Sequence, residues 1–159
     1  MSSMLKPGDE VPDFRLRAGT GQTVDSQALR GKRWVIYFYP KDNTPGCAIE
    51  TKEFGLALPD FRTLNVEVFG CSVGGVDAKT KFAEACGAPD LPLLADEDHH
   101  VAELFGVWKP SEVSGSMDGK VARSTFLISP DGKVEQVWET VQPAGHAAEV
   151  LSSAVHDAP

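Results

Sequence analysis

The chain has 159 residues, enough to bury one hydrophobic core, and its 42% hydrophobic and 24% charged residues are ordinary for a globular protein. A formal net charge of −8, without any block of Lys and Arg, argues against nucleic acid or an anionic membrane as the main partner. No apolar run reaches transmembrane length and residues 1–14 lack the apolar segment of a signal peptide, so we expect a cytoplasmic protein.

The first part of the chain predicts a hairpin followed by a buried strand. Residues 14–25 (FRLRAGTGQTVD) place two short alternating segments around a Gly-rich turn, which is typical of a β-hairpin. Residues 26–31 (SQALRG) predict a single helical turn that ends at Gly31. The continuous apolar run 34–39 (WVIYFY) predicts a central strand that is buried on both faces.

The middle of the chain alternates helices and strands. We expect a helix from about Cys47 that is broken or restarted at Pro59, because proline removes a helical hydrogen bond. Residues 66–73 (VEVFGCSV) predict the next strand. Residues 77–86 (DAKTKFAEAC) predict a helix, and Gly87 is a good C-terminal cap for it.

The last third predicts two further helices and a second hairpin. Residues 91–96 predict a short strand, and residues 96–107 (DEDHHVAELFGV) predict a helix with acidic residues in its first turn. Residues 108–120 (WKPSEVSGSMDGK) predict a polar loop. Residues 123–139 contain two strands around a Pro-Asp-Gly turn, and a final helix is expected over 146–155.

The order of these elements points to one α/β domain. Crossover β-α-β units and antiparallel hairpins occur in the same chain, which favours a central mixed sheet flanked by helices, with an N-terminal β-hairpin. The sequence contains no internal repeat, low-complexity tract or long linker. We therefore expect a single domain over residues 1–159.

The cysteine and histidine content excludes several kinds of site. Three cysteines (Cys47, Cys71 and Cys86) are too few for a disulfide framework, and no CxxC pair is present. None of the four histidines has ligand spacing with a cysteine, so zinc is not expected. We predict no metal and no other cofactor.

Cys47 stands where a buried strand passes into a helix, after the segment PKDNTPGC (40–47). Unpaired backbone N–H groups and the helix macrodipole favour a thiolate at such a position. Thr44 offers a hydroxyl to the sulfur or to a bound oxygen atom, and Pro40 and Pro45 stiffen the loop. The alternative is that Cys47 is only a small buried hydrophobic residue, which is common for free cysteine.

The segment around Cys47 resembles the active-site motif of the peroxiredoxins. The pattern P-x-x-x-T-x-x-C occurs at 40–47, and the longer string FYPKDNTPGCAIE (38–50) is similar to the peroxiredoxin Q subgroup, also called bacterioferritin comigratory proteins. The resemblance extends over most of the chain, including LKPGDEVPDF, VFGCSVGGVDAKTKFAE, LPLLAD and RSTFLISPDGKV. It implies a thioredoxin fold and a thiol peroxidase that reduces hydrogen peroxide and organic hydroperoxides.

The resemblance also implies a role for each matching residue. Cys47 is the peroxidatic cysteine that becomes a sulfenic acid, Thr44 hydrogen-bonds the peroxide, and Pro40 shapes the pocket. Arg123 corresponds to the family's active-site arginine, which favours the thiolate and stabilises charge on the departing oxygen. Glu50 corresponds to an acid that orients this arginine. The alternatives are an ordinary surface charge for Arg123 and a favourable first-turn charge for Glu50.

The sequence leaves open how Cys47 is regenerated. Many members of the subgroup carry a resolving cysteine five residues after the peroxidatic one, where this chain has Lys52. Other members carry it in the next helix, and Cys86 is the candidate there, although an alignment puts the family position at Ala83. The alternatives are a one-cysteine mechanism with an external thiol and a minor role for Cys71, which is expected to be an inert core thiol.

The expected partners are peroxides and a reductant, either thioredoxin or another small thiol, and the resemblance to the subgroup suggests a monomer. One alternative function is a thiol–disulfide oxidoreductase, against which the missing CxxC argues. Another alternative is a redox sensor or interaction protein that uses oxidation of Cys47 as a signal, without turnover.

Overall fold

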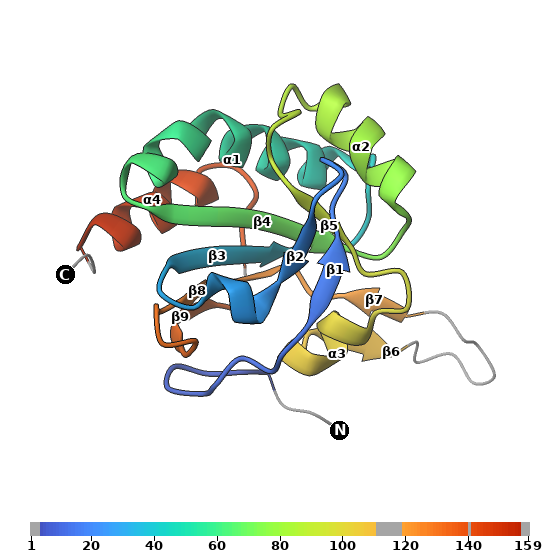
Figure 1. Ribbon diagram of the computed structural model, residues 1–159. Coiled ribbons are helices and arrows are strands. Elements are labelled where there is room, and N and C mark those ends of the chain that lie inside the picture. Colours follow the sequence, from blue (N-terminus) through green and yellow to red (C-terminus); the bar gives the residue numbers. More distant parts are fainter. Residues whose placement is uncertain (1–3, 111–118, 140, 157–159) are drawn as a thin grey trace.

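The centre of the fold is a five-stranded mixed sheet in the strand order β5-β4-β3-β8-β9 (Figure 1). The computed structural model describes residues 4–110, 119–139 and 141–156. The strands of the sheet are β3 (Arg33–Phe38), β4 (Val66–Ser72), β5 (Leu93–Ala95), β8 (Ser124–Ile128) and β9 (Val134–Trp138).

Strand β3 lies in the middle of this sheet. It pairs in parallel with β4 and antiparallel with β8, and all six of its residues are buried. Strands β4 and β5 are parallel, whereas β8 and β9 are antiparallel. The prediction of a mixed sheet with a central strand buried on both faces is therefore confirmed.

Helices cover both faces of the sheet, and the side chains of β3 divide between two cores. Val35 and Tyr37 pack with one helix layer, whereas Trp34, Ile36 and Phe38 pack with the other side. The first layer contains α1 (Pro45–Thr63), α2 (Val76–Ala85) and α4 (His146–His156), above the sheet in Figure 1. The second side contains α3 (His100–Phe105), β6 (Trp108–Pro110) and β7 (Gly119–Val121).

The predicted N-terminal hairpin is present as β1 (Arg15–Arg17) and β2 (Thr23–Asp25), followed by a short 3₁₀ turn at Ser26–Leu29. The hairpin turn contacts α2, because the hydroxyl of Thr80 donates to the Gly19 carbonyl at 2.7 Å. Among the described residues, none of the helices has the length and apolar character to cross a membrane.

Helix α1 is longer than predicted and passes through Pro59 without a break. Proline has no N–H, so the helix loses the bond that would reach the carbonyl of Gly55. The buried side chains Phe54, Leu58 and Phe61 lie on both sides of this position and hold the helix on the sheet. Tertiary packing outweighs the local cost of the proline, so the predicted break is wrong.

Helix α3 is shorter than predicted, because the acidic residues before it act as caps. The two carboxylate oxygens of Asp96 accept the N–H groups of Val101 at 3.1 Å and Ala102 at 2.9 Å. Asp96 therefore lies before the helix, satisfying its first donors. The helix ends at Gly106, which has a φ of 76°.

The predicted loop 108–120 is a hairpin at its two ends. Trp108 pairs with Val121 and Lys109 with Lys120, whereas residues 111–118 lie outside the described residues. Gly119 allows the close pairing, because a Cβ there would lie 2.5 Å from the Trp108 ring.

Helix α1 makes a close approach to the connection between α2 and β5. A Cβ on Gly55 would lie 2.4 Å from the Cβ of Ala88, so only glycine fits at this point of the helix. Ala88 follows Cys86 by two residues, and the middle of α1 is therefore held directly against the segment that carries Cys86.

Candidate active site

Cys47 lies in the first turn of α1 and is completely buried, with 0% of its surface exposed. The loop from Pro40 connects it to the end of β3, and Thr44 is the N-cap of the helix. The Ala48 N–H makes the first helical bond, to the Thr44 carbonyl at 2.9 Å. The sulfur is therefore at the positive end of the helix macrodipole, as the sequence predicted.

The guanidinium of Arg123 bridges Cys47 and Glu50. Its Nη2 lies 3.3 Å from Cys47 Sγ, and its Nη1 donates to Glu50 Oε1 at 2.7 Å. Arg123 directly precedes β8, whereas Glu50 is one helical turn after Cys47. Gly46 leaves room for this contact, since a Cβ there would lie 3.2 Å from Nη2. The structure thus brings together the arginine, the acid and the cysteine named from the sequence.

Glu50 carries a buried carboxyl group with a perturbed proton affinity. Its exposed fraction is 1%, and burial raises its pKa from 4.5 to about 7, although the Arg123 charge opposes the rise. Oε2 has no hydrogen-bond partner among the described residues. Burial disfavours the charge of Arg123, but its contacts with Cys47 and Glu50 raise its pKa above the ordinary value. The site therefore holds a permanent cation beside the sulfur and an acid that titrates near neutrality.

Thr44 and Pro40 border this group. The Thr44 hydroxyl donates to the carbonyl of Lys41 at 2.9 Å, so its hydrogen is directed into the loop rather than to the sulfur. Its oxygen lone pairs are left to accept a hydrogen bond. Pro40 is half-buried and directly follows Tyr39, which is buried and lies just after β3.

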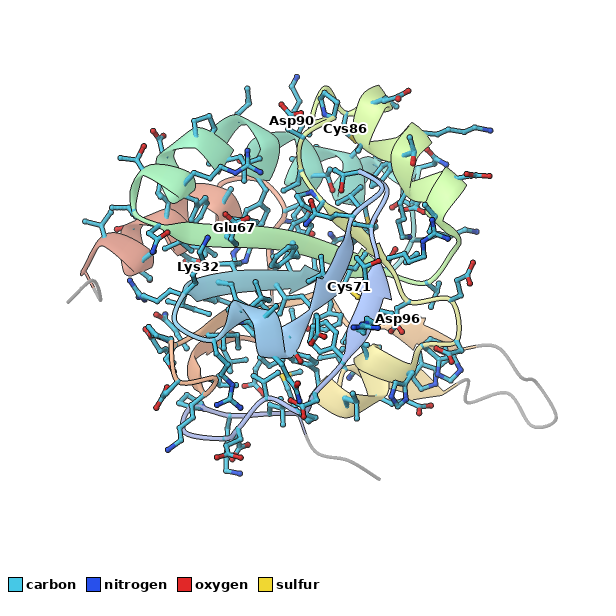
Figure 2. All side chains as sticks on the ribbon, viewed as in Figure 1. Lys32, Glu67, Cys71, Cys86, Asp90 and Asp96 are labelled. Carbon is cyan, nitrogen blue, oxygen red and sulfur yellow. The ribbon has the colours of Figure 1, made fainter. Side chains whose placement is uncertain are left out.

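The other two cysteines, Cys71 and Cys86, lie in different parts of the fold (Figure 2). All three cysteines are free thiols. Cys86 caps the C-terminal end of α2, is 9% exposed and belongs to the same core as Cys47. Burial raises its pKa, and the charges of Asp42 and Cys47 add to the rise. Cys71 lies within β4, opposite Phe38 of β3, and burial raises its pKa well above the usual value.

Sequence reasoning missed two charged residues near the site, Asp42 and Lys79. Lys79 is completely buried on α2 and donates to Asp42 Oδ2 at 2.9 Å. The signal was its spacing, because Lys79 precedes Phe82 by three residues and Ala83 by four, which places it on the buried face. In the part of the chain that the structure describes, no group of three or more His, Cys, Asp or Glu side chains is arranged to hold a metal ion.

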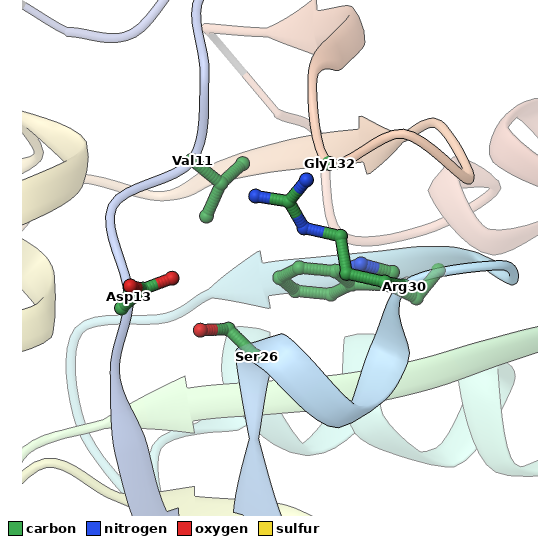
Figure 3. A pocket seen from close by; sticks show the side chains of 6 residues that line it. Val11, Asp13, Ser26, Arg30 and Gly132 are labelled. Atoms are coloured by element: carbon green, nitrogen blue, oxygen red, sulfur yellow. The ribbon is translucent and has the colours of Figure 1, made fainter.

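A small cavity lies away from Cys47, under the N-terminal segment (Figure 3). Its volume of about 10 Å³ suits about one water molecule, so it is too small for a substrate. Figure 3 shows the side chains of Val11, Asp13, Ser26 and Arg30 around it. The cavity is lined by Val11, Asp13, Ser26, Arg30, Trp34 and Gly132.

Several known proteins are similar to this chain in sequence and in fold. Residues 7–137 match the model of the AhpC/TSA family. Peroxiredoxin Bcp of Bacillus subtilis is 38% identical over 149 residues, with 94% of each chain covered. Xanthomonas campestris peroxiredoxin Q has a TM-score of 0.86 and 35% identity over 98% of both chains. A structure of X. campestris bacterioferritin comigratory protein has a TM-score of 0.87 and 34% identity, covering 99% of this chain and 100% of that one.

These likenesses cover nearly the whole chain and agree with the arrangement of sheet and helices described above. They confirm the predicted thioredoxin fold of peroxiredoxin type. The chain therefore belongs to the AhpC/TSA family of thiol peroxidases, in its Bcp, or peroxiredoxin Q, subgroup.

Proposed function

We propose that the chain reduces hydroperoxides at Cys47, the peroxidatic cysteine. The observation that carries this proposal is the 3.3 Å contact between Arg123 Nη2 and Cys47 Sγ. A guanidinium beside a buried sulfur stabilises the thiolate, which is the nucleophilic form of cysteine. The X. campestris protein is described as having alkyl peroxide reduction activity, which supports organic hydroperoxides as substrates beside hydrogen peroxide.

The reaction is a displacement on the O–O bond. The Cys47 thiolate attacks one peroxide oxygen, and an S–O bond forms as the O–O bond breaks. The departing oxygen takes a proton and leaves as water, or as an alcohol from an organic hydroperoxide. Cys47 becomes a sulfenic acid, so the sulfur is oxidised by two electrons and the peroxide is reduced by two.

The surrounding residues act on the charge and position of the peroxide. Arg123 lies where negative charge moves from the sulfur to the departing oxygen, and its fixed cation stabilises that charge. Glu50 holds Nη1 of Arg123 at 2.7 Å and so fixes the direction of Nη2. Thr44, whose hydroxyl hydrogen is bound to Lys41, accepts a hydrogen bond from the peroxide O–H. Pro40 forms part of the pocket wall.

For regeneration, we propose that Cys86 resolves the sulfenic acid as an intramolecular disulfide, which thioredoxin or another small thiol then reduces. Cys86 shares a core with Cys47. A disulfide requires the two Cα atoms to come within about 7 Å. We infer that the first turn of α1 unwinds around Cys47 to allow this approach.

Three further features of the proposal follow from the expectations set by the sequence. The chain folds as one domain over residues 1–159. It works as a monomer, as the resemblance to the peroxiredoxin Q subgroup suggests. Its cytoplasmic location stays a prediction, which cell fractionation would test.

The test is peptide mass spectrometry after one equivalent of hydrogen peroxide, with and without dimedone. Wild type is expected to form a Cys47–Cys86 disulfide, and Cys86→Ser is expected to give a dimedone adduct on Cys47. A Cys47 adduct in wild type with Cys86 free would replace the disulfide route by an external thiol. The proposed function would be contradicted if both thiols stay unmodified. It would also be contradicted if Cys47→Ser consumes peroxide as wild type does.

Turnover distinguishes a peroxidase from a sensor. With thioredoxin, its reductase and NADPH present, peroxide consumption is expected to continue far beyond one equivalent. A reaction that stops after one equivalent with every tested thiol would favour a sensor that uses oxidation of Cys47 as its signal.

A further inference from the structure

Lys79 is a charged side chain that the proposed reaction does not use, although none of its surface is exposed. Its Nζ donates to Asp42 Oδ2 at 2.9 Å, to Ser72 Oγ at 2.6 Å and to the Val73 carbonyl at 2.6 Å. An ammonium group has three N–H donors, so each donor has an acceptor. Two of the acceptors come from the last residue of β4 and the residue after it, and the third comes from the loop before Cys47.

Asp42 is the point at which this loop is attached to the body of the fold. One carboxylate oxygen binds Lys79, and the other accepts the Tyr39 hydroxyl at 2.7 Å. Tyr39 is buried, its N–H binds the Cys71 carbonyl at 3.1 Å, and its ring lies 5.4 Å from Lys79 Nζ. The Asp42 side chain is 10% exposed, so both of its attachments are inside the protein.

The attachment continues to the start of α1. Asp42 directly follows Lys41, whose carbonyl accepts the Thr44 hydroxyl at 2.9 Å. Thr44 is the N-cap of α1, and Cys47 follows in the first turn. A chain of contacts therefore runs from α2, through Lys79 and Asp42, to the helix end that carries the sulfur.

Burying an ion pair costs free energy, because both charges lose their contact with water. Burial lowers the pKa of Lys79, and the hydrogen bond and charge of Asp42 oppose this effect. Apolar side chains of similar volume often stabilise a core as well as a buried pair does, whereas the pair imposes a particular geometry. Lys81, on the exposed side of the same helix, has no such contacts. The burial of the Lys79 charge is thus explained by its contact with the carboxylate of Asp42.

We propose that Lys79 is a positioning residue for Cys47: by binding Asp42 it holds loop 40–44, and with it the first turn of α1, in the arrangement in which Arg123 reaches the sulfur. Only the catalytic part of this proposal rests on the proposed function. When the pair breaks, the loop and the first turn open while the sheet stays folded.

The test compares Lys79→Met and Asp42→Asn with wild type, and uses Lys81→Met as the matched control. Hydrogen exchange followed by mass spectrometry reports opening at residues 44–50, with β8 as the reference for global unfolding. Single-turnover consumption of hydrogen peroxide reports the rate at Cys47. Both variants are expected to exchange at least tenfold faster at 44–50, with β8 unchanged, and to react with peroxide at least tenfold more slowly.

Two results would overturn the proposal. In one, either variant matches Lys81→Met in exchange at 44–50 and in peroxide rate. In the other, β8 exchanges faster by the same factor as 44–50, which would make the pair a contributor to global stability alone. If Lys79→Met does not fold, Asp42→Asn decides, because it keeps the size of the side chain and removes the charge and one of the two acceptor oxygens. The hydrogen-exchange result does not depend on peroxidase activity. If wild type does not consume peroxide, the proposed function fails, whereas the exchange at residues 44–50 still tests whether Lys79 holds the loop.

Discussion

The carboxyl group of Glu50 makes the stability of the protein depend on pH near neutrality. Its pKa is about 7 in the folded chain, because burial disfavours its charge, and 4.5 is its ordinary value. The folded state therefore binds the proton more tightly than the unfolded state does. The resulting stabilisation is complete below pH 4.5 and is lost as the pH rises through about 7.

The size of the effect follows from the difference between the two pKa values. At about 1.4 kcal/mol per pH unit, the full effect on the free energy of unfolding is about 3 kcal/mol. About 2 kcal/mol of this falls between about pH 5.5 and 8.5, a range that avoids acid unfolding. Glu50 is almost completely buried, so solvent screening does not reduce the figure much.

The assay is urea unfolding of Cys47→Ser and of the double variant Cys47→Ser/Glu50→Gln at several pH values. The serine background removes ionisation of the cysteine from the comparison. The double variant is expected to gain about 2 kcal/mol relative to its parent between about pH 5.5 and 8.5, with most of the gain below about pH 7 and a plateau above it. Glu84→Gln in the same background is the control, because Glu84 is exposed on α2 and should give no such trend.

Two outcomes would refute this reasoning. If the difference between the two proteins does not change with pH, the carboxyl group of Glu50 does not titrate in this range. If instead the Gln variant loses stability relative to its parent as the pH rises toward about 5.5, the ion pair with Arg123 outweighs burial. The folded pKa would then lie below 4.5 rather than near 7.

Three further substitutions test the site and its support. Arg123→Met is expected to lower the second-order rate constant for hydrogen peroxide about 10²-fold, because the cation at 3.3 Å from Sγ is lost, whereas the exposed Arg62→Met should match wild type in the same stopped-flow assay. Thr44→Val is expected to lower this rate constant about tenfold and Thr44→Ser to restore it, and equal rates for both variants would argue against the hydroxyl. Gly55→Ala is expected to cost about 1–3 kcal/mol in urea unfolding, since its Cβ would lie 2.4 Å from that of Ala88, and Ala88→Gly should recover most of the loss unless the clash is relieved elsewhere.

Local patterns predicted most of the fold, since the features that place its elements are written in short stretches of sequence. The apolar run 34–39 specified a strand buried on both faces, and β3 is that strand. The segment 40–47 specified a cysteine at a helix start. Arg123 is different, because it is 76 residues from the cysteine that it contacts. Only the resemblance to a family connected the two before the structure did.

The remaining errors arise where long-range packing or a side-chain cap competes with a local rule. The rule that proline ends a helix failed at Pro59, because the helix is held on the sheet on both sides of it. The start of α3 was misplaced, because Asp96 caps the helix instead of joining it. Lys79 was overlooked, because a lysine at a buried helical position is interpreted as exposed unless its partner, 37 residues away, is known.

The close approach of Gly55 and Ala88 has a consequence for the proposed disulfide between Cys47 and Cys86. It works as a fixed pivot: the middle of α1 cannot slide or swing as a rod, because its backbone is already in contact with the segment just after Cys86. Cys47 is eight residues before the pivot, or about 12 Å along the helix axis. If Cys86 resolves Cys47 as proposed, the approach of the two sulfurs is then expected to come from uncoiling on the Cys47 side of Gly55, and the length of chain that uncoils is at most the part of α1 before Gly55.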